Sequence, residues 1–231
     1  MQFTPFVIDE IVSESEQVRT FKLKPRDGAL PAFLPGHFFL LGLTGAEGKR
    51  IFRSYSIASL PKEGVLQFCV KLKGIFTNML WNLKAGDSVE VSGPFGLFLL
   101  IPDDTQRVFV GGGVGIAPLR AMILQTLQEG KKAYLFHSSR VFEELTYYSQ
   151  FKKMQEENPN FKFISCITRD APDGWKGLCE RLSVPAIKKE LGTLDGKSYY
   201  FCGAKEMEKA IVGGLLAENV PKDKIRTESW G

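Results

Sequence analysis

The sequence predicts two domains, an antiparallel β-barrel or sandwich over residues 1–101 and an α/β domain over residues 102–231. Short β-rich segments, broken at close intervals by Gly and Pro, fill the first half, as in an all-β domain. In the second half, apolar strand segments alternate with helical segments, which is typical of a parallel sheet with helices on both faces. Pro102-Asp103-Asp104 interrupts the pattern between the halves. Five strand segments follow, and they predict a doubly wound, five-stranded parallel sheet.

The first half predicts six strands and one short helix, separated by turn residues such as Pro35-Gly36 and Ala85-Gly86-Asp87. Gly45–Gly48 is the expected tip of the hairpin between the third and fourth strands. The expected strands are Phe3–Val12, Gln17–Lys24, His37–Leu43, Ile51–Ala58, Leu66–Leu72 and Ser88–Val91, and the expected helix is Phe76–Leu83.

The second half predicts alternating strands and helices after a junction within Ile101–Gln106. The expected strands are Arg107–Val110, Ala133–His137, Phe161–Thr168, Ser198–Cys202 and Lys224–Glu228. The expected helices are Ala117–Gln128, Glu143–Glu156, Val184–Lys189 and Lys205–Ala217.

The composition is that of an ordinary soluble globular protein, since 44% of the 231 residues are hydrophobic and 24% are charged. The net charge of +4 is spread evenly over the two halves, so no basic arm indicates nucleic-acid binding. No apolar run approaches the roughly 18–20 residues that span a bilayer, and the N-terminus lacks a secretory signal pattern. We therefore expect a cytoplasmic protein with no transmembrane segment and no nucleic-acid partner.

Metal ligands are not clustered in the sequence. Its four cysteines form no Cys-x-x-Cys pair, so neither a zinc site nor an iron–sulfur cluster is expected. The two histidines, His37 and His137, are far apart as well. We expect no metal centre, and we expect the cysteines to be free thiols.

A glycine-rich turn follows the first expected strand of the second half, in the segment Gly111-Gly112-Gly113-Val114-Gly115-Ile116-Ala117-Pro118. Such a turn lets the backbone approach a pyrophosphate and presents free N–H groups at the positive end of a helix. Pro118 stands where the usual dinucleotide fingerprint has its third Gly or Ala, and proline is compatible with a first helical turn. A plain tight turn between a strand and a helix is the alternative.

Two segments of the first half carry further candidate binding groups. In Arg53-Ser54-Tyr55-Ser56, the guanidinium offers a planar fork for phosphate, and the tyrosine on the same strand face can stack on a planar ring. A half-exposed strand is the alternative. In Gly74-Ile75-Phe76-Thr77, a glycine and then a hydroxyl open a short helix, which indicates a second phosphate site. A simple helix N-cap is the alternative there.

The expected strand Ser198–Cys202 ends in Cys202-Gly203, and a helix follows. In a doubly wound sheet, ligands lie outside the carboxyl ends of the strands. Cys202 is therefore expected to face the same crevice as Gly113. A buried cysteine that acts as a small apolar side chain is the alternative.

In this order, the motifs resemble those of the ferredoxin–NADP reductase superfamily. The match also includes Pro35-Gly36-His37-Phe38, where the family has Pro-Gly-Gln-Phe, and Ser92-Gly93-Pro94-Phe95-Gly96, so that it covers nearly the whole chain. The resemblance implies a flavin-binding antiparallel β-barrel over residues 1–101 and an NAD(P)-binding α/β domain over residues 102–231. It also implies FAD, together with NADPH or NADH, as cofactors.

The resemblance implies roles for several residues around the flavin. Arg53 would hold the flavin phosphate, Tyr55 would stack on the isoalloxazine, and Ser56 would lie near its N5. Gly74–Thr77 would bind the FAD pyrophosphate, and Trp230 would cover the other face of the flavin. The implied flavin residues are Arg53, Ser54, Tyr55, Ser56, Val70, Gly74, Ile75, Phe76, Thr77 and Trp230.

In the second domain, the resemblance places the pyrophosphate of the pyridine nucleotide on Gly113, Gly115 and Pro118, and the nicotinamide beside Cys202. Val114 stands where many family members have a threonine that bonds the nicotinamide. The implied NAD(P) residues are Gly112, Gly113, Val114, Gly115, Pro118, Ser139, Arg140, Cys202 and Gly203.

The coenzyme depends on the residues that follow the second strand of this domain, which ends in Ser138-Ser139-Arg140 with no acid before Glu143. A carboxylate there grips the ribose of NAD, whereas a basic residue accommodates the phosphate of NADP. The sequence therefore favours NADPH over NADH. Ser56, Cys202 and Glu228 are the candidate catalytic residues, and we expect them to tune polarity and proton access without acting as covalent nucleophiles.

Three functions remain open. The first is a reductase with tightly bound FAD that passes electrons to a separate acceptor such as a ferredoxin, a flavodoxin, a haem protein or an oxygenase component. The second is a flavin reductase that uses free flavin as its substrate, against which Gly74–Thr77 speaks. The third is a subunit or sensor without catalytic activity. Retained yellow colour separates the first function from the second, and hydride transfer separates both from the third.

Overall fold

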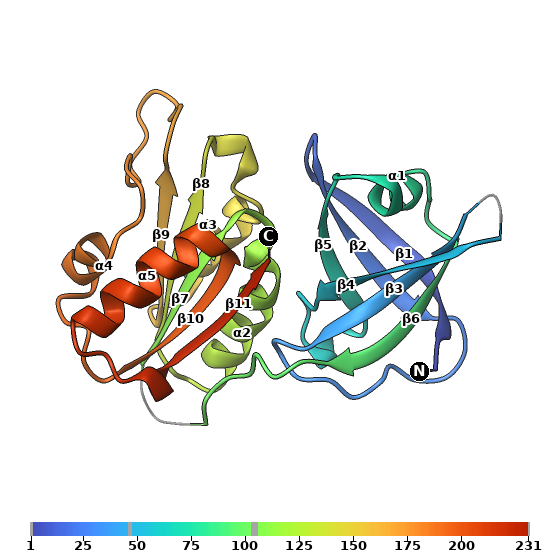
Figure 1. The fold of residues 1–231 in the computed structure, drawn as a ribbon, viewed down its shortest axis with the longest axis horizontal. Helices are drawn as coiled ribbons and strands as arrows, with labels where there is room; N and C mark the ends of the chain where they lie inside the picture. Colours follow the sequence, from blue (N-terminus) through green and yellow to red (C-terminus); the bar gives the residue numbers. More distant parts are fainter. Residues whose placement is uncertain (1, 46–47, 103–105, 231) are drawn as a thin grey trace. The chain divides into compact units, whose positions relative to one another are not determined.

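The computed structural model describes residues 2–45, 48–102 and 106–230. The chain separates into two compact units, Met1–Leu99 and Leu100–Gly231 (Figure 1). Each unit has its own sheet and its own hydrophobic core.

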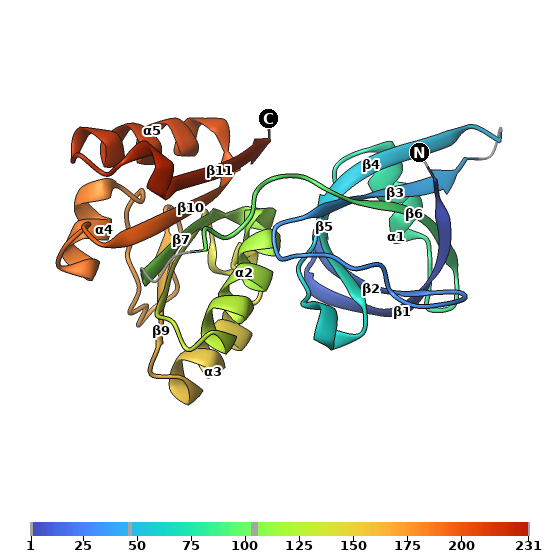
Figure 2. The same cartoon turned by 90° about the horizontal axis from the view of Figure 1, so that it is seen from below.

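The first unit is a six-stranded antiparallel sheet in the order β4-β3-β6-β1-β2-β5. Its strands are β1 (Thr4–Ser15), β2 (Val18–Pro25), β3 (Phe38–Thr44), β4 (Arg50–Ser56), β5 (Leu66–Lys71) and β6 (Ser88–Phe95). The two end strands come together, because the N–H of Ala58, just after β4, donates to the carbonyl of Gln67 in β5 over 2.8 Å. The sheet therefore curls into a barrel (Figure 2), and the predicted antiparallel barrel is confirmed.

Alternating inward-facing side chains fill the barrel. In β2, Phe21 and Leu23 are fully buried and lie opposite Phe68 and Leu66 of β5 in the ladder. This spacing of two residues is the period of a strand with one buried face. Helix α1 (Ile75–Trp81) adds Phe76 and Leu80 to the same core. The packing holds the start of α1 against the barrel.

The second unit is a five-stranded parallel sheet with helices on both faces, as predicted. Its strands, ordered β11-β10-β7-β8-β9, are β7 (Gln106–Gly112), β8 (Ala133–Ser139), β9 (Phe161–Ile167), β10 (Lys197–Ala204) and β11 (Ile225–Trp230). Helices α2 (Ile116–Gln128) and α3 (Tyr148–Glu157) cover one face, and α4 (Val184–Leu191) and α5 (Lys205–Ala217) cover the other (Figures 1 and 2).

Both faces of this sheet are buried, which explains its continuous apolar strands. Val108 and Val110 of β7 belong to the core on the α4–α5 side. Phe109, between them, points to the other face and stacks on Tyr200 of β10 with ring centroids 5.2 Å apart. A residue pattern that is apolar at every position therefore still specifies a strand here.

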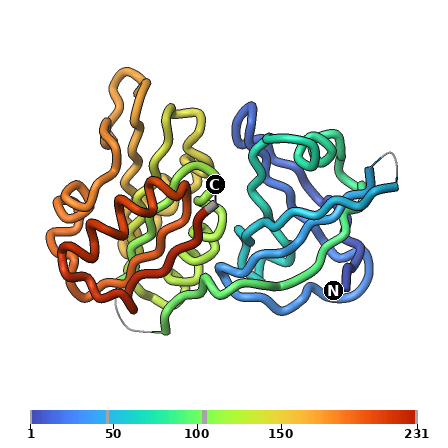
Figure 3. The backbone as a smooth tube through the Cα atoms, in the orientation of Figure 1, coloured from blue at the N-terminus to red at the C-terminus, as the bar shows by residue number. Residues whose placement is uncertain are grey.

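The strand order creates a switch point next to β7. The chain runs from β7 to β8 and β9 in one direction, and then crosses back to β10 and β11 on the other side of β7. The connection between β9 and α4, orange in Figure 3, is long and irregular and extends past the end of the sheet. In such sheets, ligands bind outside the carboxyl ends of the strands at the switch point, which here lies between β7 and β10.

The prediction of one helix over Glu143–Glu156 is wrong at its start. A single 3₁₀ turn covers Phe142–Glu144, and α3 begins only at Tyr148. Tyr147 has a φ of +63°, which no α-helix accommodates. Its ring is buried beneath the guanidinium of Arg120. Tertiary packing therefore overrides the helical pattern in this segment.

Smaller differences lie at element ends. β6 continues beyond Val91 to Phe95, because Phe95 pairs with Phe38 of β3 after an irregularity in the ladder. Of the predicted hairpin tip Gly45–Gly48, residues 46–47 lie outside the described residues, as do residues 103–105 of the predicted junction Ile101–Gln106.

Candidate functional site

Strand β4 carries a cation, an aromatic ring and two hydroxyls in four successive residues. Arg53 and Ser54 are exposed, and Arg53 donates only to the neighbouring carbonyl of Phe52 (2.8 Å) among the hydrogen bonds of the described residues. The half-buried ring of Tyr55 stacks on Phe76 of α1 with centroids 6.0 Å apart and planes 30° apart. Burial raises the pKa of Tyr55 to about 12, although the charge of Arg53 opposes this. Tyr55 therefore presents a neutral aromatic wall at neutral pH.

The turn that starts α1 is held by its own side chains. Gly74 has a φ of +126°, which favours glycine. The Thr77 hydroxyl accepts a hydrogen bond from the Lys73 N–H (2.8 Å) and donates to the Gly74 carbonyl (3.0 Å). The Asn78 side-chain amide donates to the same carbonyl (2.9 Å). Because Thr77 uses its only proton inside the turn, the N–H groups of the first helical turn remain as the donors for a ligand.

The other predicted flavin residues lie in three different places. Ser56 is half-buried at the end of β4, where it pairs with Phe38 of β3. Val70 is fully buried in the barrel core, so its side chain supports the wall from inside. Trp230 ends β11 in the second unit, opposite Ala204 of β10, and its side chain lies outside the described residues.

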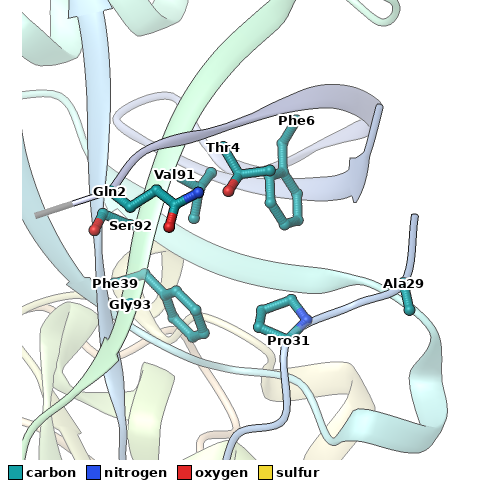
Figure 4. Close-up of a pocket in the computed structure, with 9 residues that line it drawn as sticks. All are labelled: Gln2, Thr4, Phe6, Ala29, Pro31, Phe39, Val91, Ser92 and Gly93. Atoms are coloured by element: carbon teal, nitrogen blue, oxygen red, sulfur yellow. The ribbon is translucent and has the colours of Figure 1, made fainter. Parts of the chain in front are cut away.

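A small pocket opens in the wall of the barrel, apart from these residues (Figure 4). Its volume of about 130 Å³ suits a few waters, which take up about 30 Å³ each in the liquid. A flavin ring system does not fit in it. Phe39, one of its lining side chains, is the ladder partner of Tyr55. The lining residues are Gln2, Thr4, Phe6, Ala29, Pro31, Phe39, Val91, Ser92 and Gly93.

In the second unit, glycines allow the carboxyl ends of β7 and β10 to lie close together. A Cβ at Gly203 would be 3.3 Å from the backbone nitrogen of Gly112. A Cβ at Gly112 would be 3.2 Å from the sulfur of Met207 in α5. The segment Cys202-Gly203 therefore lies beside the glycine cluster, as predicted from the strand ends.

The glycine cluster leads directly into α2. Gly113 has a φ of +54°, and Gly113–Gly115 form a 3₁₀ turn before the helix. The N–H of Ile116 donates to the carbonyls of Gly113 and Val114. Pro118 lies in the first turn of α2 and is buried. No heavy atom lies within 4 Å of a Cβ built on Gly113, so the turn opens onto free space.

Cys202 and Glu228 are neighbours across β10 and β11. They are register partners, and the thiol sulfur lies 4.0 Å from a carboxylate oxygen of Glu228. Cys202 is fully buried. Burial, followed by the negative charges of Glu228 and Glu208, raises the pKa of the Cys202 thiol well above its usual value. The thiol therefore stays protonated, which agrees with the expectation that it is no nucleophile.

Ser139 ends β8, Arg140 follows it, and the two residues differ in accessibility. The Ser139 hydroxyl donates to the Val141 carbonyl (2.6 Å) and is buried, so its only proton serves the local turn. Arg140 is exposed. The exposed Arg169 lies beside it, because the Arg169 N–H donates to the Arg140 carbonyl over 3.0 Å. Arg169 has no counterpart in the motifs found from the sequence.

His137 is the residue near the glycine turn to which the sequence motifs assign no role. It is fully buried on β8, where Gly111 is its register partner, and its Nε2 lies 3.4 Å from the carbonyl oxygen of Gly113. The available signal was its position at a strand end, next in the sheet to the glycine turn. The composition and the residue spacing alone do not indicate which residue His137 contacts.

The described part of the chain offers neither a metal cluster nor a membrane-spanning helix. Within residues 2–45, 48–102 and 106–230, no group of three or more His, Cys, Asp or Glu side chains is placed to hold a metal ion. The four cysteines are free thiols. Over the same ranges, no helix combines the length and the apolar character that crossing a bilayer requires.

Two protein families match the chain. The oxidoreductase FAD-binding domain matches residues 5–99, which are nearly all of the barrel unit. The oxidoreductase NAD-binding domain matches residues 109–213 of the α/β unit. Between them, the two matches include both glycine turns.

Among curated proteins, a component of the Na(+)-translocating NADH-quinone reductase of Haemophilus ducreyi is 32% identical over 202 residues. That match covers 79% of this chain and 49% of the relative. The chain thus spans about half the length of the curated relatives it matches.

Among solved structures, the cytochrome P450 reductase GcoB of Amycolatopsis superposes with a TM-score of 0.85 at 28% identity, covering 99% of this chain and 69% of that one. A ferredoxin NADP+ reductase from Neisseria gonorrhoeae with bound FAD and NADP superposes with a TM-score of 0.86 at 23% identity, covering 99% of each chain. The second likeness shows the shared two-unit fold.

The residues present fit the two cofactors. Ile75, next to Phe76 at the start of α1, is 76% exposed although it is apolar, which suits a surface that a ring system covers. In the other unit, the open turn at Gly113 leaves room for a phosphate at the first turn of α2. The chain therefore uses FAD together with NADH or NADPH. It belongs to the ferredoxin–NADP reductase-like superfamily and carries the FAD-binding and NAD-binding domains of oxidoreductases.

Proposed function

We propose that this protein takes hydride from NAD(P)H onto a tightly bound FAD and passes the electrons to a separate acceptor. The acceptor is a small redox protein, such as a ferredoxin or flavodoxin, or a haem or oxygenase component. The observation that carries the proposal is the structured turn at the start of α1. Its hydrogen-bonded backbone beside the Tyr55–Phe76 stack supports a phosphate site that belongs to the barrel itself. An enzyme that releases its flavin after each turnover does not need such a site.

In the barrel, each residue has a proposed task. Arg53 pairs with the flavin phosphate, the Tyr55 ring packs on the isoalloxazine, and Ser56 hydrogen-bonds near its reactive edge. The backbone of Gly74–Thr77 donates to the pyrophosphate. Ser54 and Val70 complete the proposed flavin site of the barrel, and the flavin-covering role of Trp230 stays a prediction from the resemblance.

In the α/β unit, the nicotinamide nucleotide is proposed to lie across the carboxyl ends of β7 and β10. Gly112–Gly115 and Pro118 form the pyrophosphate site, and Cys202 and Gly203 form the floor under the nicotinamide. The close approach of Gly203 to Gly112 supports this, because a side chain at either position would press on neighbouring protein atoms and push the two strand ends apart. Arg140, with Arg169 beside it, is proposed to bind the 2′-phosphate of NADPH.

Catalysis in this proposal rests mostly on positioning. Bound FAD supplies the redox chemistry, accepting a hydride and giving up electrons singly or in pairs. The Tyr55–Phe76 stack orients the ring plane, and the glycine turns hold both ligands by their phosphates. Cys202 and Glu228 set a polar, proton-holding edge in which the thiol proton stays on sulfur.

The acceptor is inferred from the relatives. One is named as a cytochrome P450 reductase and another as a subunit of an NADH-quinone reductase, so the names give a cytochrome and a quinone as acceptors separate from the flavin. We propose the same division of labour here. The predicted cytoplasmic location stays a prediction, as does the preference for NADPH over NADH.

The test is the visible spectrum of the purified protein during anaerobic titration with NADPH and, separately, NADH. We expect flavin bands that survive desalting, FAD on release, and bleaching at lower concentrations of NADPH than of NADH. A colourless protein that oxidises NAD(P)H only with added free flavin would replace the proposal with a flavin reductase. A protein inert toward both coenzymes and added flavin would contradict it altogether.

A further inference from the structure

His137 is placed where a core side chain meets the nucleotide turn. It lies at the carboxyl end of β8, between Gly111 of β7 and Ser165 of β9 in the ladders, and is fully buried. Its face of the sheet also carries Leu135 and Phe109, two residues further from the turn along β8 and β7. An apolar residue would fill this position without leaving a polar atom to satisfy.

The contact with Gly113 determines the state of the imidazole. A carbonyl oxygen can only accept a hydrogen bond, so Nε2, at 3.4 Å, must carry the proton. Nδ1 is then a bare acceptor, and it has no hydrogen-bond partner among the described residues. Burying such an atom is costly. The position therefore retains a histidine despite half of its polar groups being unsatisfied, which calls for an explanation beyond packing.

The imidazole does not act as a cation toward phosphate. Burial lowers the pKa of His137 to about 4, and the hydrogen bond to Gly113 offsets this only in part. At pH 7, the imidazole is therefore neutral. What it offers the turn is a single neutral N–H donor.

That donor bears on the orientation of one peptide group. In a trans peptide, the C=O and the following N–H point in opposite directions. The Gly113 carbonyl accepts from the Ile116 N–H of the helix and lies against the buried imidazole, and holding it in this direction points the Val114 N–H the opposite way. If this peptide flipped, a carbonyl oxygen would face the phosphate and repel it. Such a flip would change ψ of Gly113 and φ of Val114, and of these two residues Gly113, with its φ of +54°, is the one that tolerates most backbone conformations.

We propose that His137 is a positioning residue for the nucleotide: its Nε2–H holds the Gly113 carbonyl inward, so that the turn presents N–H groups to the pyrophosphate. This rests on the proposed function, because it assumes that the pyrophosphate of NAD(P)H binds at Gly112–Gly115. The contact comes from a neighbouring strand, so no local motif around the glycines encodes it.

The test compares two substitutions of His137 with one matched control in the FAD-loaded protein. His137→Phe keeps a ring and removes the donor, and His137→Gln places an amide N–H near the position of Nε2. Phe136→Leu is the control, since Phe136 is equally buried on the same strand and faces the other core. Calorimetry measures binding of ADP-ribose, which contains the pyrophosphate, and of AMP, which does not.

We expect the dissociation constant of ADP-ribose to rise about tenfold in His137→Phe, to stay within twofold of wild type in His137→Gln, and to be unchanged in Phe136→Leu. AMP should bind all four proteins alike. Unchanged ADP-ribose binding in His137→Phe would overturn the proposal. The proposal would also be overturned if His137→Phe and Phe136→Leu weakened the binding of ADP-ribose and of AMP equally, because loss of packing would then explain the effect of both substitutions.

A measurement on the wild-type protein without nucleotide complements the variants. Nitrogen-15 NMR of the histidine side chains should show His137 neutral with its proton on Nε2. A proton on Nδ1 would overturn the proposal even if every variant failed to fold. If wild type binds neither ADP-ribose nor NAD(P)H, the proposed function fails, whereas the tautomer still decides whether the imidazole holds the Gly113 carbonyl.

Discussion

The two glycine turns that start α1 and α2 differ in what holds them. At α1, Thr77 and Asn78 bond the backbone of their own turn. At α2, no side chain of the turn caps the helix, and the side-chain contact found among the described residues comes from His137 on β8. One turn is thus closed by residues within four positions of its glycine, and the other depends on the sheet beneath it.

This difference separates two ways of building a phosphate site. A locally closed turn keeps its shape as long as its own few residues are intact. A turn supported from a neighbouring strand keeps its shape only while the sheet is formed, so its geometry is coupled to the stability of the whole unit. On the barrel side, Arg53 lies on β4 two residues before Tyr55, whose ring stacks on Phe76 of α1, whereas the α2 turn consists of glycines and Val114.

The largest expected effect comes from removing that cation. Arg53→Ala should raise the dissociation constant of FAD about 10- to 100-fold, because a hydrogen bond to a charged group contributes about 1.5–3 kcal/mol. FAD fluorescence released on dilution measures this directly. Arg50→Ala is the control, since Arg50 lies on the same strand but is paired with Glu90. Equal FAD loss in both variants would mean that only the general positive charge of the barrel matters.

The next effect concerns the support under α2 and depends on pH. The pKa of His137 is about 4 in the folded protein, below its ordinary value of 6.5. Between these values, the unfolded chain binds a proton on His137 that the folded chain refuses. Stability is therefore complete above pH 6.5 and falls as the pH drops toward 4. From pH 7 to pH 5, protonation of His137 in the unfolded chain should lower the free energy of unfolding by about 2 kcal/mol, at 1.36 kcal/mol per pKa unit.

Urea unfolding of wild type and His137→Gln at several pH values isolates this contribution. Both proteins share all other titrating groups, so the difference between their free energies of unfolding should shrink or invert by about 2 kcal/mol as the pH falls from 7 to 5. If the free energies of unfolding of the two proteins changed with pH in parallel, His137 would not be the buried neutral group that the structure describes.

The fold was predictable from the sequence because both units follow simple periodic patterns. Alternation in Phe21 and Leu23 reports a strand with one buried face, and the run Val108–Val110 reports a strand buried on both. The start of α3 was not predictable, since Tyr147 leaves helical geometry to pack under Arg120, which lies elsewhere in the chain.

The candidate site likewise has one part that the sequence predicts and another that only the fold reveals. Gly74–Thr77 and Gly111–Pro118 are contiguous segments, so the sequence shows them. His137 and Arg169 act through neighbours that only the sheet supplies, since β8 lies between β7 and β9. Two hydroxyls that the sequence predicted as ligand-binding groups have a different role in the structure. Thr77 and Ser139 both use their single proton within the chain, which no spacing rule foretells.

The smallest expected effect compares the two glycines directly. Gly74 combines a φ of +126° with a ψ of −168°, a region that is essentially restricted to glycine, whereas Gly113 lies in the left-handed region at +54°. A Cβ at either position meets no heavy atom within 4 Å, so alanine tests the backbone alone. Gly74→Ala should destabilise the protein by about 1 kcal/mol more than Gly113→Ala, a difference of about 2–4 °C in Tm.

A stability cost of Gly113→Ala that equals or exceeds that of Gly74→Ala would be informative, because backbone strain alone cannot produce it. If Gly113→Ala cost as much as Gly74→Ala, a further interaction would have to be lost at α2, and the side-chain candidate is the contact between His137 and the Gly113 carbonyl, which also accepts from the Ile116 N–H. A double-mutant cycle of Gly113→Ala with His137→Phe decides this, since two residues that share one hydrogen bond show costs that do not add. Additive costs together with a larger loss at Gly113 would place the extra interaction elsewhere and would contradict the view that the sheet supports this turn through His137.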